Sequence, residues 1–306
     1  MRAALQITGL PSEGEVRTRF PTTHVAALVG DRYLVKLHYE DWFGESCFQS
    51  EREGYAFLRG SGLPIPELLA EGSLYPPEGP GWRWPFLVMT VMPGRDLRSL
   101  GAALTREDLE RCADFVGDVL GRLHDVPVHD AEHTRHDAYV ELIRARMAAC
   151  ARDHRAWASL PPHMVEEVRD YVWEAHHLID PDREPPVLIH GDLHGGNLFV
   201  TGEPGFLTPV GIVDFNDIYL GDRHYDLVAV HLRALQADKR LLRRALDAYG
   251  WGRLEPEWPR RMLAQTLTHD YDLIRPVVDR FPSIRSVATL DELAARLWDL
   301  DAPGLR

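Results

Sequence analysis

Two short apolar runs in the second half of the chain each lead directly into polar side chains, and this feature restricts the fold most. The run at residues 187–189 continues into HGDLHGGN at residues 190–197, and the run at residues 210–213 continues into Asp214. Apolar runs of this length, bounded by polar and glycine residues, predict buried strands. We therefore expect the polar ends of both strands to meet at one site.

The spacing within the first polar segment is chemically informative. Asp192 and Asn197 follow the pattern Asp-x-x-x-x-Asn of a kinase catalytic loop. There the Asp accepts the proton of an acceptor hydroxyl, and the Asn oxygen holds Mg²⁺ against the phosphates. Asp214 comes 22 residues after Asp192, where a kinase places the metal-binding Asp of its Asp-Phe-Gly triplet. The third residue here is Asn216, which departs from the protein-kinase pattern.

A zinc site is an alternative interpretation of the same segment. His190, Asp192 and His194 alternate, so that on a strand they would share one face and could ligate zinc. Glycines at positions 191, 195 and 196 make a regular strand improbable there. A polar turn without chemistry would leave the second acidic strand end unexplained.

The first third of the chain offers the lysine that a kinase requires. Lys36 lies in the apolar run Leu34-Val35-Lys36-Leu37, and Glu51 and Glu53 follow on a predicted helix. In a kinase, such a lysine binds the α/β-phosphates and a helix glutamate orients it. The competing interpretation places Lys36 on a solvent-exposed strand face. From the residues alone, either glutamate could be the partner.

The residues before Lys36 argue against an ordinary protein kinase. No Gly-x-Gly-x-x-Gly loop precedes the lysine, and the segment Phe20-Pro21-Thr22-Thr23-His24 takes its place. We therefore expect Thr22, Thr23 and backbone amides to cover the phosphates.

The remaining pattern predicts an α+β fold with two lobes. A hairpin with a Gly30-Asp31 turn is expected over residues 26–37, a helix over 45–59 and a buried strand over 84–92. Beyond Pro93-Gly94 the pattern becomes mainly helical, and Thr105 and Asp108 resemble a capping box. We expect a small β-rich lobe at residues 1–92 and a larger helical lobe at residues 93–306, with the chemistry in the cleft between them.

Composition narrows the class of partner and the compartment. The 34 Lys and Arg residues against 47 Asp and Glu give a net charge of −13, which disfavours nucleic-acid binding and attracts cations. No apolar run approaches the 18 residues that a membrane span needs, and no signal-peptide core can form before Gly9 and Pro11. Three widely spaced cysteines indicate reduced thiols, so we expect a cytoplasmic protein.

Together these segments resemble a known family. HGDLHGGNLFV, GIVDFNDIYLGDRHYDLVAVHL and WPFLVMTVMPG are similar to the aminoglycoside phosphotransferase and choline kinase superfamily, and the likeness extends from about Leu28 to Trp298. The resemblance implies a bilobal, protein-kinase-like fold and ATP-dependent phosphorylation of a small molecule. It further implies an aminoglycoside antibiotic as the cationic substrate, with hygromycin B as the expected one, and hence antibiotic resistance.

The resemblance also implies roles for residues near the nucleotide. Asp192 is the expected catalytic base, Asn197 and Asp214 the Mg²⁺ ligands and Lys36 the phosphate-binding lysine. Alignment on Glu-Arg-Glu-x-x-x-x-Leu selects Glu53 over Glu51 as the lysine's partner.

Adenine is expected at the hinge, where Thr90 and Met92 offer backbone groups and Met89 lies behind the ring. His190 is expected to orient the segment 190–197 by hydrogen bonding, and Asp226 is expected to support it from the helix below.

The acceptor site should present several carboxylates, because one exposed carboxylate–ammonium contact contributes only about 1 kcal/mol or less. The candidates are the acidic residues after the second strand and a later acidic segment with a tyrosine: Asp217, Asp222, Asp270, Asp272 and Tyr271. Each could instead lie on a solvated helix face. A kinase of a metabolic amino alcohol or sugar is the alternative enzyme, and a catalytically silent nucleotide-binding module is the alternative of another class.

Overall fold

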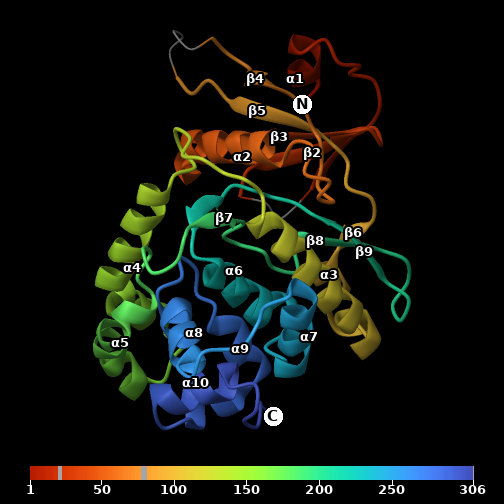
Figure 1. Cartoon of the computed structure of the whole chain (residues 1–306). Coiled ribbons are helices and arrows are strands. Elements are labelled where there is room, and N and C mark those ends of the chain that lie inside the picture. The colour runs from red at the N-terminus through yellow and green to blue at the C-terminus, as the bar shows by residue number, and fades with distance from the viewer. Residues whose placement is uncertain (20–22, 77–80, 306) are drawn as a thin grey trace.

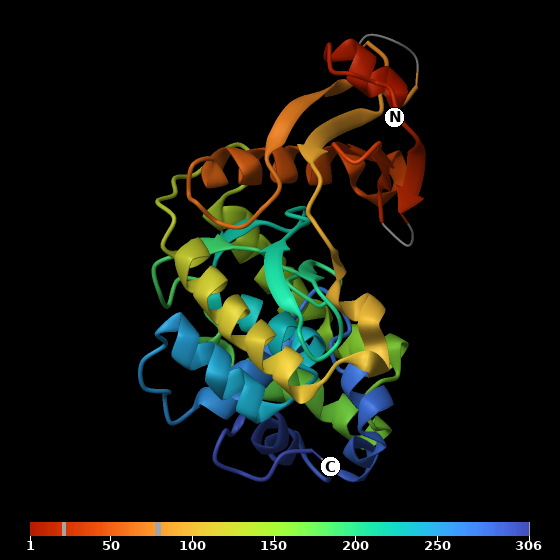
Figure 2. The same ribbon diagram turned by 90° about the vertical axis from the view of Figure 1, so that its right-hand side faces the viewer.

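The computed structural model describes residues 1–19, 23–76 and 81–305 of the chain. A small antiparallel sheet with helices lies at one end of the molecule, and a larger, mainly helical part carries the C-terminus at the other (Figure 1). Figure 2 shows the chain passing from the sheet into the helical part. This arrangement confirms the α+β, bilobal, kinase-like fold expected from the sequence.

The N-terminal lobe is built on five strands in the order β1-β2-β3-β5-β4. These strands are β1 (Val16–Arg19), β2 (Val25–Val29), β3 (Tyr33–Leu37), β4 (Leu68–Ser73) and β5 (Pro85–Thr90). The predicted hairpin is present, since β2 pairs with β3 in antiparallel register from Val25↔Leu37 to Val29↔Tyr33. Gly30 has φ of 59° in its turn, a conformation that favours glycine.

The sheet buries its two faces differently. Val35, Phe86 and Val88 pack with Leu5 of helix α1 (Arg2–Ile7) on the outer face. The inner face packs on helix α2 (Gly44–Leu58), whose buried residues include Phe48, Tyr55 and Leu58. Side chains alternate across a strand, so Lys36 points to the inner face, away from Val35. There it is 7% exposed, which corrects the solvent-exposed alternative.

The chain leaves β5 for the larger lobe through residues 91–94. Short strand β6 (Arg95–Asp96) and 3₁₀ segment η2 (Leu97–Ala103) follow, and then helix α3 (Arg106–His124). The predicted capping box is confirmed: the Thr105 hydroxyl accepts from the Asp108 amide at 3.2 Å, and the Asp108 carboxylate accepts from the Thr105 amide at 3.2 Å.

Two small sheets carry the polar segments that the sequence singled out. Strand β7 (Val187–Ile189) pairs with β10 (Tyr219–Gly221), and β8 (Leu198–Thr201) lies between β6 and β9 (Thr208–Ile212). The segment 190–197 leaves β7 and enters β8, and Asp214 follows β9. The amide of Val213 donates to the carbonyl of Asn197 at 3.0 Å, which joins the ends of the two segments.

Helices supply most of the remaining core. They are α4 (His136–Trp157), α5 (Pro162–Glu174), α6 (Arg223–Ala229), α7 (Lys239–Tyr249), α8 (Trp258–Leu267), α9 (Arg275–Arg280) and α10 (Leu290–Trp298). Short helical segments also occur at η1 (Glu40–Trp42), η3 (His176–Leu178), η4 (Val230–Ala234) and η5 (Pro282–Ser286). Segment η4 has π-helical hydrogen bonding and continues directly from α6. Within the described ranges, no helix combines the length and apolarity needed to cross a membrane.

Candidate functional site

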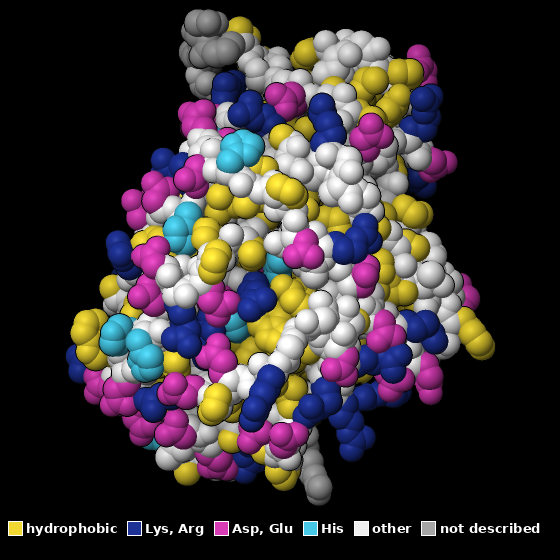
Figure 3. Space-filling view, in the orientation of Figure 1, with side chains coloured by type: hydrophobic (Ala, Val, Ile, Leu, Met, Phe, Trp, Pro, Cys, Tyr) yellow, Lys and Arg dark blue, Asp and Glu magenta, His cyan; other side chains and the backbone are white. Residues whose placement is uncertain are grey.

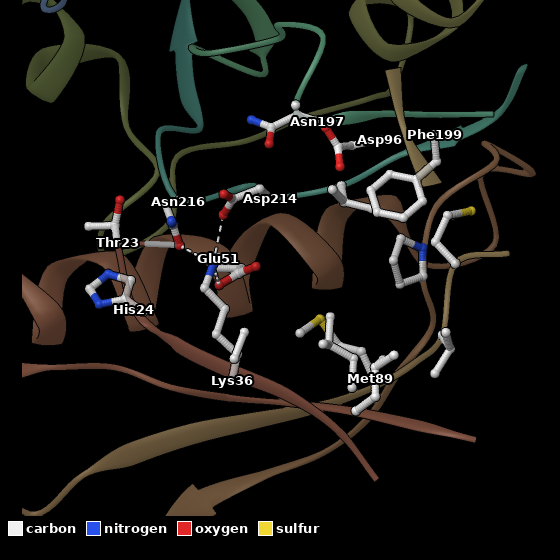
Figure 4. A pocket seen from close by; sticks show the side chains of 18 of the residues that line it. Thr23, His24, Lys36, Glu51, Met89, Asp96, Asn197, Phe199, Asp214 and Asn216 are labelled. Carbon is white, nitrogen blue, oxygen red and sulfur yellow. Dashed lines mark hydrogen bonds and ion pairs between the residues drawn. The ribbon is translucent and has the colours of Figure 1, made fainter. Parts of the chain in front are cut away.

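A cleft of about 620 Å³ separates the sheet from the helical lobe, and both lobes line it. Its walls contain most of the residues that the sequence placed near a nucleotide, together with several that it did not (Figure 4). Predicted residues that line it are Thr23, Lys36, Met89, Met92, Asp192, Asn197 and Asp214. Thr22 lies outside the described residues.

Lys36 lies at the centre of a cluster of oxygen atoms in this cleft. Its ammonium nitrogen is 2.6 Å from Asp214 Oδ1, 2.8 Å from Glu51 Oε2 and 2.9 Å from Asn216 Oδ1 (Figure 4). Burial alone would lower the pKa of Lys36, but the charges of Asp214 and Glu51 outweigh it and raise that pKa. The lysine is therefore positively charged and fixed in place.

The structure corrects the choice of Glu53 as the partner of Lys36. Residues two positions apart on a helix are rotated by about 200°, so Glu51 and Glu53 project from nearly opposite sides of α2. The carboxylate of Glu53 instead accepts from the amide of Thr134 at 2.7 Å and from that of His133 at 3.1 Å. Both amides belong to the loop between α3 and α4, so Glu53 connects the two lobes.

His38, the residue that follows β3, supports Glu51. The His38 Nε2 atom is 3.2 Å from Glu51 Oε2, and the ring is fully buried. Burial lowers the pKa of His38, so the ring is neutral near pH 7 and Nε2 can donate to the carboxylate. This residue was not predicted, although a position two residues after Lys36 in extended chain lies on the same face as the lysine.

The segment 190–197 is anchored from both sides. Asp226 of α6 accepts from the amides of His190 at 2.8 Å and Gly191 at 2.7 Å, as expected for a residue that supports the loop. His190 Nε2 is 3.1 Å from the carbonyl of Val213, and its Nδ1 is 3.4 Å from the amide of Asp192. Both ring nitrogens of His190 thus have protein partners, which argues against the zinc alternative.

Asp192 has a cation and an imidazole as neighbours. Its Oδ1 is 3.1 Å from Nη1 of Arg233, and its Oδ2 is 3.6 Å from Nε2 of His194. Burial, with the charges of Asp217 and Asp214, raises the pKa of Asp192 to about 8 against the opposing charge of Arg233. The raised pKa gives this carboxylate a higher proton affinity than an ordinary aspartate has, which suits a group that takes up a proton during a reaction.

Asn197 and Asp214 offer oxygen atoms to the same space. The Asn197 Nδ2 group donates to the carbonyl of Asp192 at 3.0 Å, and the side-chain oxygen points toward Asp214 (Figure 4). Burial opposes ionisation of Asp214, but Lys36 outweighs it and lowers the pKa of Asp214. A carboxylate and an amide oxygen are the donors that Mg²⁺ prefers, so these two residues fit that ion.

The hinge residues differ in what they present to the cleft. Met89 is 1% exposed and lines the cleft, and Met92 and Val91 follow it. Thr90 is turned away: its hydroxyl accepts from the amide of Glu67 at 2.9 Å, and its amide donates to the Glu67 carbonyl at 3.0 Å. Val91 was missed, since an apolar side chain there gives no chemical signal.

Asp217 and Tyr271 form a pair beyond Asp192. The Tyr271 hydroxyl donates to Asp217 Oδ2 at 3.1 Å. Burial and the charge of Asp214 raise the pKa of Asp217 to about 6. Asp270 is next to Tyr271 in sequence, and its Oδ1 is 3.6 Å from Nε of Arg146. These acidic groups leave a region of partly compensated negative charge.

The structure contradicts the prediction that Asp222 belongs to the acceptor site. Its side chain is 4% exposed, and its Oδ2 accepts from Arg261 at 3.0 Å and from Gln265 at 2.9 Å. Its Oδ1 accepts from the amide of His224 at 2.9 Å and caps α6. Glu184, Asp222 and His224 are close enough together to hold a metal ion, but the guanidinium of Arg261 already pairs with both carboxylates.

Asp272 is a second correction. Its Oδ1 accepts from the amide of Arg275 at 3.0 Å, and its Oδ2 accepts from the hydroxyl of Ser159. These contacts satisfy the first amide of α9 and connect it to the segment that follows α4, so the carboxylate is used inside the helical lobe.

Comparison with known proteins agrees with this geometry. The chain is 26% identical over 216 residues to the aminoglycoside 3′-phosphotransferase of Streptomyces fradiae, covering 68% of this chain and 74% of that protein. It is 28% identical over 183 residues to the streptomycin 3″-kinase of Streptomyces griseus, covering 58% and 62%. A solved GDP and kanamycin complex of APH(2″)-IIIa has the same fold, with a TM-score of 0.64, 18% identity and coverage of 93% and 97%.

A family model adds a match that spans most of the chain. It covers residues 14–263, a range that includes Lys36, the segment 190–197 and Asp214. The chain therefore belongs to the phosphotransferase enzyme family.

Proposed function

We propose that this protein transfers the γ-phosphoryl group of ATP to a hydroxyl of an aminoglycoside antibiotic, and that hygromycin B is the substrate. One observation carries the proposal: the Lys36–Glu51–Asp214 cluster and the Asp192–Asn197 loop face each other across a single cleft. The names of the Streptomyces relatives support an aminoglycoside as acceptor. The proposed setting is the cytoplasm, where the modification would confer resistance.

Each side chain then has a role in the transfer. Lys36 binds the α/β-phosphates, held by Glu51, and Met89 and Met92 border the adenine. Asn197 and Asp214 would hold Mg²⁺, which neutralises phosphate charge when bound. The boundary between lobes at residues 92 and 93 stays a prediction.

The chemistry forms one bond and breaks one. The acceptor oxygen forms a bond to the γ-phosphorus, and the bond from that phosphorus to the β,γ-bridging oxygen breaks, leaving ADP. Asp192 takes the proton of the hydroxyl at its carboxylate. Arg233 holds that carboxylate in position at 3.1 Å.

The carboxylates near Asp192 favour an acceptor that carries positive charge. Asp217 carries the hydroxyl of Tyr271 on one oxygen, and Asp270 is only loosely paired with Arg146. Ammonium groups of an aminoglycoside would bind to these two residues, while Asp222 and Asp272 are engaged elsewhere.

A panel assay tests the proposal. The purified protein is incubated with Mg²⁺, ATP or GTP, and each of several aminoglycosides, amino alcohols and sugars, and the products are weighed by mass spectrometry. We expect one added phosphate on hygromycin B, formed much more slowly by the Asp192→Asn variant. Phosphate on an amino alcohol or a sugar alone would favour the metabolic kinase, and absence of any ATP turnover would favour a silent module.

A further inference from the structure

Arg98 is a cation of the cleft that has no role in the proposed transfer as described so far. Among the residues that the structure describes, three Lys or Arg side chains line the cleft: Lys36, Arg95 and Arg98. Lys36 is paired with two carboxylates, and Arg95 lies 3.7 Å from Glu203. Over the described residues, no carboxylate oxygen lies within 4 Å of the Arg98 guanidinium. Arg98 is thus an exposed arginine of the cleft whose guanidinium is not paired with a carboxylate of the described residues.

The backbone around Arg98 fixes where its side chain begins. The amide of Arg98 donates to the carbonyl of Gly195 at 2.9 Å. Its neighbour Leu97 is buried, and Asp96 caps the turn by accepting from the amide of Ser99 at 3.0 Å. Segment η2 is therefore attached directly to the loop that carries Asp192.

The side chain of Arg98 extends over Gly196, close to the catalytic loop. A Cβ placed on Gly196 would lie 3.1 Å from Arg98 Cζ and 2.7 Å from His194 Cε1, so the two side chains pack where the glycine leaves space. His194 Nδ1 accepts from the amide of Gly196 at 3.0 Å, which places its proton on Nε2, 3.6 Å from Asp192 Oδ2. One imidazole ring thus separates Arg98 from Asp192.

We propose that Arg98 is a catalytic residue that binds the γ-phosphoryl group of ATP and stabilises it during transfer. The inference rests on the proposed function, which places that group between the Lys36 cluster and a hydroxyl at Asp192. In phosphoryl transfer, negative charge spreads over three equatorial oxygens, and a planar guanidinium can donate to two of them. The charge of Lys36 is shared by two carboxylates, whereas that of Arg98 is not.

The test compares Arg98→Ala, Arg98→Lys and Arg152→Ala, the last removing an exposed arginine of α4 as a control of equal charge. Arg98→Ala should lower kcat about ten- to a hundredfold, the range for losing a charge-assisted hydrogen bond. It should weaken binding of the ATP analogue AMP-PNP by a larger factor than binding of ADP. Arg98→Lys should recover part of both, and Arg152→Ala should match the wild type.

Three outcomes would overturn the inference. They are a kcat of Arg98→Ala within twofold of wild type, an equal loss of affinity for ADP and AMP-PNP, and a change confined to the acceptor KM. Failure of the kinase assignment would look different, because the wild-type protein would then turn over no ATP with any acceptor. Wild-type binding of both nucleotides without transfer to an aminoglycoside would remove the proposed acceptor, while the two affinities would still test Arg98.

Discussion

Around Lys36, the carboxylates of Glu51 and Asp214 are both turned toward one ammonium, whereas the carboxylates beyond the segment 190–197 are divided among different partners. Asp222 pairs with Arg261, and Asp217 accepts from a tyrosine hydroxyl. The first region is thus ordered by the protein's own charges before any ligand binds. The second keeps only part of its negative charge available to a cationic acceptor.

This difference follows from what each region must recognise. A triphosphate presents the same charges whatever the acceptor, so a fixed arrangement of lysine, carboxylate and amide serves it. An acceptor with several ammonium groups needs carboxylates that remain free to pair with it. Surface charge gives little guidance, because acidic and basic side chains are interspersed over the face shown in Figure 3.

The largest expected effect is on the chemical step, at the point where the two regions meet. Replacing Asp192 with Asn removes the proton acceptor and preserves the shape, so kcat should fall by about 10²–10⁴-fold. Nucleotide affinity, measured by calorimetry, should stay near the wild-type value because the Lys36 cluster is intact. Near-normal turnover would show that positioning alone supports transfer.

Asp222 tests whether an acidic residue of the second region has a purely structural role. Asp222→Ala removes the cap of α6 and one carboxylate from the buried guanidinium of Arg261, which keeps Glu184 and Glu255 as partners. We therefore expect a loss of about 2–3 kcal/mol in the free energy of unfolding. Urea denaturation measures this loss. As a matched control, Asp272→Ala removes the acceptor of one amide at the start of α9 and should cost about 1 kcal/mol. A stable Asp222→Ala protein with a raised acceptor KM would return Asp222 to the acceptor site.

Substitutions of Glu51 and Glu53 provide a test variant and its control for the cluster around Lys36. Glu51→Gln removes one charge from Lys36, so the KM for ATP should rise about tenfold. Glu53→Gln keeps an oxygen for the amides of His133 and Thr134 and should leave that KM unchanged. Steady-state kinetics at saturating acceptor separates the two. Equal changes in KM would contradict the assignment of Glu51 as the partner.

The smallest effect is expected from pH at Asp217. Because the pKa of Asp217 is raised to about 6, its carboxylate is ionised at pH 7.5 and becomes protonated as the pH falls toward 5. The acceptor KM should therefore rise by about two- to fivefold over that range, as for the loss of one partly exposed ion pair. In Asp217→Asn the KM should be higher at pH 7.5 and nearly independent of pH. A wild-type KM that falls on acidification would exclude this role.

The sequence spacing was sufficient to predict the residues that phosphoryl transfer requires at fixed positions along the chain. Asp192 and Asn197 lie on one loop, and Asp214 ends the neighbouring strand, so a short-range pattern identifies them. The choice between Glu51 and Glu53 depended instead on which side of α2 faces the sheet. That orientation is set by the packing of Phe48 and Tyr55.

Residues brought together by distant contacts were harder to predict. Arg233 is 41 positions from Asp192 and meets it only because η4 follows α6 beneath the loop. Asp222 did carry a local signal, since Asp immediately before a helix is a common cap. The predicted acceptor site included Asp222 because it is acidic and close to Asp214 in sequence, and its capping position was not considered.

The contact between Glu53 and the loop after α3 has a consequence for motion. The chain crosses between the lobes at residues 91–94, and the loop containing His133 and Thr134 meets α2 on the other side of the molecule (Figure 1). The line that joins these two attachments acts as a rotation axis. Rotation of one lobe about this axis keeps both attachments, whereas a twist of one lobe in any other direction would break one of them. The amide of Thr134 reports on this restraint, since its hydrogen exchange would accelerate whenever the lobes detach.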